Sequence, residues 1–114
     1  LQVKRIYEPP DESDGYRVLV ERLWPRGVSK ERAQLHLWLK EVAPSPQLRQ
    51  WYAHDPAKWD EFQKQYWAEL EQATAAVAQL RQLLKQGTLT LVYAARDEQR
   101  NSAIVLKAFL EQAP

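Results

Sequence analysis

The sequence contains no cysteine, and this absence excludes several kinds of chemistry. A chain without cysteine has no disulfide framework, no thiolate nucleophile and no thiolate site for zinc or an iron–sulfur cluster. Its two histidines, His36 and His54, are too few for a histidine-rich metal site. Its three glycines, at positions 15, 27 and 87, cannot form the glycine-rich loops of dinucleotide or P-loop sites. We therefore expect neither a metal site nor a cofactor.

The chain also lacks a large excess of charge of either sign. Its 16 basic and 15 acidic side chains leave a formal net charge of +1, unlike the strongly basic surfaces typical of nucleic-acid-binding domains. A length of 114 residues suits one ordinary domain, and 45% hydrophobic with 27% charged residues is typical of a globular protein. No apolar run approaches the roughly 20 residues of a membrane span. We expect a single cytoplasmic domain over residues 1–114, without membrane contact.

Extended and helical patterns alternate along the chain, as in an α/β domain. Residues 16–20 have the composition of a strand, and the end of 88–94 is nearly continuously apolar, as in a strand covered on both faces. Short strands are also predicted at residues 3–7 and 35–41, although 35–41 fits a helix as well. The predicted fold class is α/β, a single small domain. Its short, mostly parallel sheet is sandwiched by helices in a Rossmann-like, three-layer arrangement.

The helix starts carry recognisable signals. Ser29 is placed to cap a short helical turn, and Ser45 followed by Pro46 is typical of the start of a helix, here one reaching to about residue 53. A longer helix carries Trp59, Phe62, Tyr66 and Leu70 at helical spacing, while Trp67 lies one position off this stripe, where it is open to exposure. Two more helices are predicted, one from residue 74 to Gly87 and one that carries residues 105–110.

The loop after the last predicted strand is the first candidate site. In open α/β sheets, ligands bind beyond the carboxyl ends of the strands, where loops lead into helix N-termini that favour anions. This loop holds Arg96, Asp97, Arg100 and Asn101. Arginine offers a planar fork for phosphate or carboxylate, and Asp97 can accept a hydrogen bond from a hydroxyl group or a base edge. The structural alternative is that Asp97 caps the next helix and the arginines form a solvated rim.

The second candidate is the loop over residues 22–27, extended to Lys30. Trp24 is suited to stacking on a base, while Arg22, Arg26 and Lys30 are suited to neutralising phosphates. The alternative is that Trp24 fills the edge of the core and that Arg22 pairs with Glu21 or another carboxylate. The sequence fits both interpretations equally well.

His54 is a third candidate, because the pKa of histidine suits proton transfer near neutral pH. A histidine that precedes a helix-capping residue such as Asp55 also fits a purely structural role. The four serines lie at turn or cap positions without the flanking glycines of a nucleophile elbow, so serine-based hydrolysis is not expected.

Several ordered segments carry a family resemblance. They are residues 3–7, 15–27, 37–45, 48–51, 54–56 and 91–97, together with Asn101. With these segments the chain resembles the YeaO-like branch of the DUF488 family, a domain family of unknown function, and the resemblance implies an α/β domain. Many wider relatives carry a cysteine after the last strand and a Cys-His-Arg-like run at the helix start. This chain has Tyr93-Ala94-Ala95 and Gln99-Arg100-Asn101 there, so a thiol mechanism does not carry over.

Three hypotheses follow. The leading one is an anion site for a nucleotide or a nucleic-acid segment between loops 22–30 and 96–102. The second is a cofactor-free enzyme acting on a phosphorylated or nucleoside substrate, with Asp97 or His54 as acid or base. The third is a protein-interaction module whose Trp-rich helices present an apolar patch. The oligomeric state and the strand order stay open, and the strand order decides whether the two loops meet. The ligand-binding candidates are Arg22, Trp24, Arg26, Lys30, Arg96, Arg100 and Asn101.

Overall fold

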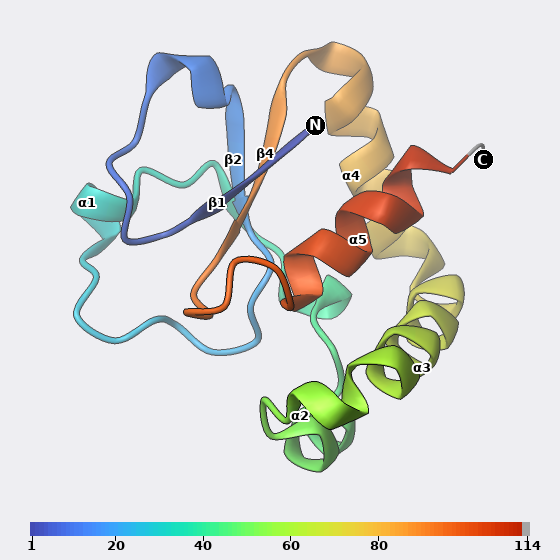
Figure 1. The fold of residues 1–114 in the computed structure, drawn as a ribbon. Coiled ribbons are helices and arrows are strands. Elements are labelled where there is room, and N and C mark those ends of the chain that lie inside the picture. Colours follow the sequence, from blue (N-terminus) through green and yellow to red (C-terminus); the bar gives the residue numbers. More distant parts are fainter. Residues whose placement is uncertain (113–114) are drawn as a thin grey trace.

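Four short parallel strands form the centre of the fold (Figure 1). In the computed structural model, which describes residues 1–112, the order across the sheet is β1-β4-β2-β3, and each neighbouring pair is parallel. All five residues of β4 are buried, as the apolar run predicted. The sheet is therefore parallel throughout, and the predicted α/β class is confirmed. The strands are β1 (Gln2–Arg5), β2 (Tyr16–Leu19), β3 (Leu37–Trp38) and β4 (Leu89–Tyr93).

Within residues 1–112, four α-helices and three short 3₁₀ turns connect the strands, and a fifth α-helix follows β4. Ser29, Ser45 and Asn101 each accept a hydrogen bond from a backbone N–H at the start of the helix that follows, as N-caps do. The two serine caps were predicted from the sequence. The helices are α1 (Lys30–Ala33), α2 (Pro46–Tyr52), α3 (Trp59–Gln72), α4 (Thr74–Gln86) and α5 (Ser102–Glu111), and the 3₁₀ turns are η1 (Glu12–Asp14), η2 (Lys40–Val42) and η3 (Pro56–Lys58).

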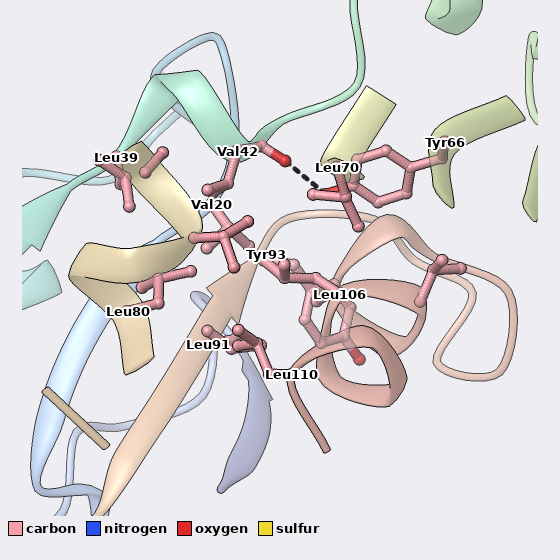
Figure 2. Packing of buried hydrophobic residues seen from close by; sticks show 14 of the residues in the cluster. Val20, Leu39, Val42, Tyr66, Leu70, Leu80, Leu91, Tyr93, Leu106 and Leu110 are labelled. Carbon is pink, nitrogen blue, oxygen red and sulfur yellow. Dashed lines mark hydrogen bonds between the residues drawn. The ribbon is translucent and has the colours of Figure 1, made fainter. Parts of the chain in front are cut away.

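The helices cover the two faces of the sheet unequally. On the first face, side chains such as Leu91 pack against residues from α2, α3, α4 and α5, and together they form the main core (Figure 2). On the second face, Leu19 and Val92 pack against Ala33 of α1 and against Trp24. The arrangement thus has three layers, but one outer layer consists of a single four-residue helix and a loop.

The region 35–41 departs from the predicted strand. Gln34 ends α1 in the left-handed conformation with φ 47°, and the chain first bonds to the backbone of β2 at His36, whose backbone N–H donates to the Arg17 carbonyl at 2.8 Å. Lys40 already starts a 3₁₀ turn, which leaves a strand of two residues. Leu35 packs against the second core, whereas Leu37 packs against the first, so the two leucines do not follow the alternation of a regular strand.

Trp67 also departs from its expected exposure. Its ring is half-buried and meets the ring of Phe109 edge-on, with 4.9 Å between the centroids. The side chain therefore joins α3 to α5 and is only partly exposed to solvent.

A buried ion pair organises the second face. A guanidinium nitrogen of Arg17 lies 2.6 Å from a carboxylate oxygen of Asp14, and both side chains are 3% exposed. The ammonium group of Lys4 on β1 lies 3.2 Å from the same carboxylate, and Thr90 of β4 donates to the Asp14 carbonyl at 2.7 Å. Arg17 also donates to the carbonyl of Ala33 at the end of α1, at 2.9 and 3.1 Å. The pair thereby joins β1, β2, β4 and α1.

Replacing Asp14 should show how much this network contributes to the free energy of unfolding. Burial alone would raise the pKa of the Asp14 carboxyl, but the Asp11 N–H, the Lys4 ammonium and the Arg17 guanidinium lower it on balance. The network therefore stabilises the fold fully above the ordinary aspartate pKa of about 3.9, and that contribution is lost as pH falls through the lower folded value. Asp14→Asn leaves Arg17 buried without a counter-charge, so we expect it to lower the free energy of unfolding at pH 7 by about 3–5 kcal/mol in urea titration.

Glu12→Gln is the matched control, because Glu12 is an exposed acid in the same turn. Its unfolding free energy should stay within about 0.5 kcal/mol of the parent. The difference between Asp14→Asn and the parent should shrink as the pH is lowered below about 4. Equal stability of the two variants at pH 7 would contradict the role given to the ion pair.

Gly15 lets β2 approach β4 closely. Its φ is +64°, and a Cβ atom there would lie 2.3 Å from the carbonyl oxygen of Thr88, which accepts the N–H of Tyr16 at 2.9 Å. Gly27 also has a positive φ, +74°, but a Cβ atom there would meet nothing within 4 Å.

The two glycines allow a paired test. Gly27→Ala should cost only the strain of the left-handed conformation, about 1–2 kcal/mol. Gly15→Ala adds a clash of about 1–3 kcal/mol between the strands, so its midpoint of urea unfolding should fall further. Equal losses for both variants would show that the close approach of Gly15 to Thr88 does not matter.

Candidate functional site

The sheet has a point where its connections diverge to opposite faces. After β2 the chain crosses to the face covered by α1, whereas after β4 it enters α5 on the other face (Figure 1). Because β2 and β4 are neighbours in the sheet, their carboxyl ends flank a crevice. Ligands of open α/β sheets bind at such a switch point.

A cavity of about 710 Å³ lies at this crevice. Its volume falls within the range of small-molecule sites, which is about 300–1,000 Å³. Five parts of the chain meet there: the segment after β2, the loop before α2, α2 with the residues that follow it, α3, and the segment from the end of β4 into α5. The lining residues are Glu21, Arg22, Leu23, Ala43, Pro44, Pro46, Arg49, Gln50, Tyr52, His54, Phe62, Ala94, Ala95, Arg100, Asn101 and Ser102.

Three arginines line the cavity. Arg22 is half-buried and donates to the carbonyls of Pro44 and Ala43, at 3.3 and 3.2 Å, so it is tied to the loop before α2. Arg49 of α2 and Arg100 before α5 are exposed. Arg22 and Arg100 were predicted from their loops, and the loops do meet here. The alternative prediction was that Arg22 pairs with a carboxylate. In the structure its side chain donates to backbone carbonyls instead.

Glu21 is the one acidic residue among the described residues that line the cavity. It follows β2 closely, and its backbone carbonyl accepts the indole N–H of Trp38 at 2.6 Å, which fixes the chain at this point. Burial raises the pKa of the Glu21 carboxyl, while the charge of Arg49 and a hydrogen bond with the backbone of Ala94 act in the opposite direction. The Glu21 carboxyl group thus shares the cavity with Arg49, whose charge acts on it.

Sequence reasoning missed both Glu21 and Arg49. Glu21 had a usable signal, since it directly follows a predicted strand in a fold whose ligands gather at strand ends. Arg49 lies in segment 48–51, which carries the family resemblance, but the sequence does not place it in the site, because a surface arginine on α2 reaches the site only through the packing of α2 against the rest of the protein.

Contacts with α3 hold α2, and with it Arg49, in place. The backbone N–H and the hydroxyl of Ser45 both donate to the carboxylate of Glu69, at 2.8 and 2.6 Å, while the Ser45 hydroxyl oxygen caps α2. Just before this point, the Tyr66 hydroxyl donates to the Val42 carbonyl (Figure 2). Burial, the first of several causes, raises the pKa of Tyr66 far above its usual range, so its hydroxyl stays a donor.

The loop before α5 is ordered by its own hydrogen bonds. The carboxylate of Asp97 accepts the backbone N–H groups of Gln99 and Arg100, at 2.9 and 3.0 Å, and lies 3.3 Å from a guanidinium nitrogen of Arg100. These bonds, that from Gln99 above all, lower the pKa of Asp97. Asn101 is buried, donates to the Asp97 carbonyl and caps α5 through Ile104, so Asn101 and not Asp97 is the helix cap. Asp97 is not among the cavity-lining residues.

Four of the predicted ligand-binding residues lie away from the cavity lining. Trp24 belongs to the second core, where its indole N–H donates to the Val28 carbonyl at 2.7 Å and its ring meets Trp38 edge-on at 5.3 Å. Arg26, Lys30 and Arg96 are exposed and do not line the cavity.

His54 lies on the cavity wall next to an aromatic cluster. Its backbone is left-handed with φ 55°, and its ring lies 6.0 Å from that of Tyr52. Tyr52 in turn stacks on Phe62, with 4.4 Å between the ring centroids. Burial raises the pKa of Tyr52, and the charge of Asp97 adds to this. One wall of the cavity is therefore aromatic.

Residues 1–112 contain neither a cluster of metal ligands nor a helix suited to a membrane. No group of three or more histidine, aspartate or glutamate side chains in this part of the chain is placed to hold a metal ion. None of its helices has the length and apolar character needed to cross a membrane.

Comparison with known proteins gives the family. The model of the DUF488-N3i family, described as the inactive DUF488-N3 subclade, matches residues 1–114. The uncharacterized protein Rv3073c of Mycobacterium tuberculosis (strain ATCC 25618 / H37Rv) is 44% identical over 110 residues, covering 96% of this chain and 92% of the relative. The uncharacterized protein YeaO of Escherichia coli (strain K12) is 42% identical over 110 residues, covering 96% of each. No solved structure matches. The predicted resemblance to the YeaO-like branch of DUF488 is confirmed, and the chain belongs to the inactive DUF488-N3 subclade.

Proposed function

We propose that the cavity between the carboxyl ends of β2 and β4 binds a small anionic ligand of the nucleotide class. The observation that carries this proposal is the convergence of Arg22, Arg49 and Arg100, from three separate segments, on one cavity at the switch point of the sheet. Guanidinium groups form strong, often bidentate hydrogen bonds with phosphate and carboxylate groups. Asn101 and Ser102 add the N-terminal end of the ten-residue α5, whose dipole favours an anion.

The rest of the cavity supports a ligand with a planar ring as well as a charge. Tyr52 and Phe62 contribute aromatic surface, and Leu23, which is 65% exposed, contributes apolar surface. Inorganic phosphate alone would leave most of the 710 Å³ to water. A nucleotide joins an anionic group to a ring of suitable size, and ligand sites typically combine apolar walls with a few placed polar groups.

Binding is better supported than catalysis. The carboxylate of Asp97 accepts hydrogen bonds from its own loop, and its lowered pKa makes it a poor proton donor or acceptor at neutral pH. The description of the family as inactive agrees with this assignment. The interaction-module hypothesis has less support, because Trp67 packs on Phe109 and Trp59 stacks on Phe62 within the described part of the chain.

Thermal unfolding with a ligand panel tests the proposal first. The panel contains inorganic phosphate, AMP, GMP, CMP, UMP and short single-stranded DNA and RNA. A ligand at 100 times its Kd adds about 2.7 kcal/mol of stability and raises the Tm by several degrees. Calorimetric titration of the best ligand with Arg49→Ala and Arg100→Ala should then show Kd values at least about tenfold weaker, since each variant loses a charge-assisted hydrogen bond.

Arg26→Ala is the matched control, because Arg26 is an exposed arginine outside the cavity lining. It should leave the Kd of a mononucleotide unchanged. If single-stranded DNA or RNA binds best, weaker binding of that strand by Arg26→Ala and Lys30→Ala would show that the strand continues along loop 22–30. The proposal would be disproved if no ligand of the panel raised the Tm, or if Arg49→Ala and Arg100→Ala both bound the best ligand with an unchanged Kd.

A further inference from the structure

The position of Glu21 adds a specific requirement to the proposed ligand, and this inference rests on the proposed function. Within residues 1–112 the ion pairs are Lys4–Asp14, Arg17–Asp14 and Arg100–Asp97, so Glu21 belongs to none of them. Arg49 acts electrostatically on its carboxyl group without coming within 4.0 Å of it. The carboxyl group and the guanidinium group therefore share the cavity without forming a salt bridge.

Glu21 also has hydrogen-bonding capacity to spare. A carboxylate has about four lone-pair sites, and within residues 1–112 the backbone of Ala94 is the one hydrogen-bonding group that lowers the pKa of the Glu21 carboxyl. The residue is half-buried and lines the cavity, so its carboxyl group combines partial desolvation with access for a ligand. A ligand with N–H donors can therefore replace water at this partly desolvated carboxylate.

We infer that Glu21 recognises the base of the ligand, and that the cavity selects guanine. A carboxylate only accepts hydrogen bonds, and its two oxygens match two adjacent N–H donors. Guanine offers such a pair in its N1–H and its 2-amino group. Adenine and cytosine place a ring-nitrogen acceptor next to their amino group, and uracil places its N–H between two carbonyls. The phosphate then lies toward Arg100 and the start of α5, and the guanine edge lies at Glu21.

Glu21→Gln tests this assignment, because glutamine keeps the shape but replaces one acceptor oxygen with a donor. Calorimetric titration of the parent protein should give a Kd for GMP at least about tenfold tighter than for AMP, with IMP, which lacks the 2-amino group, in between. Glu21→Gln should raise the Kd of GMP at least about tenfold. It should not raise the Kd of inorganic phosphate or of AMP above the values of the parent protein. Glu31→Gln, an exposed acid on α1 outside the cavity lining, should change none of these values.

Several outcomes separate the two proposals. Equal Kd values for GMP and AMP in the parent protein would overturn guanine selection while leaving the anion site intact, and so would unchanged GMP binding by Glu21→Gln. The comparison of GMP with AMP needs no variant, so poor folding of Glu21→Gln would not block the test. A parent protein that binds none of these nucleotides would overturn the proposed function itself. The trinucleotides UpGpU and UpApU extend the comparison: tighter binding of UpGpU than of GMP would identify the source of the base as single-stranded RNA.

Discussion

The buried contact between Asp14 and Arg17 holds together a face of the sheet that has little else to cover it. The opposite face has four helices and a continuous apolar core, whereas this one has a four-residue helix and a loop. Because so small an apolar layer buries little surface, the ion pair and hydrogen bonds of Asp14 and Arg17 supply part of the stability of this face. Removing either charge would leave the other buried, which makes the two residues interdependent.

The site depends on this network through the strands. Arg17 lies in β2, whose carboxyl end leads to Glu21 and Arg22, and Thr90 lies in β4, whose carboxyl end leads to the loop with Arg100. The hydrogen bond from Thr90 to the Asp14 carbonyl joins the two strands near their amino ends, opposite the carboxyl ends that lead to the site. A cavity assembled from separate segments needs such a fixed frame, because Arg22 is held by the carbonyls of Pro44 and Ala43, whereas Arg100 is held by Asp97 of its own loop.

Much of the fold was predictable because its signals are local. The apolar run 88–94 predicted β4, and serine caps predicted the starts of α1 and α2. The two-residue β3 was not predictable from alternation, since the left-handed turn at Gln34 displaced its start. Within the site, Arg22 and Arg100 followed from loops at strand ends, whereas Arg49 depends on the tertiary placement of α2. Trp24 was ambiguous for a physical reason: the composition that suits base stacking also suits packing against Trp38.

The sheet order has a consequence for how the chain acquires its structure. β4 is the last strand in sequence but lies between the first two, and its contacts with β1 join residues as far apart as Gln2 and Thr90, which are 88 positions distant. Pairing at such separation carries a large loop-closure cost and slows folding. During synthesis, β1 and β2 emerge long before the strand that joins them. Until β4 arrives, both present unpaired backbone edges, which is the period in which the nascent chain is most exposed to misassembly.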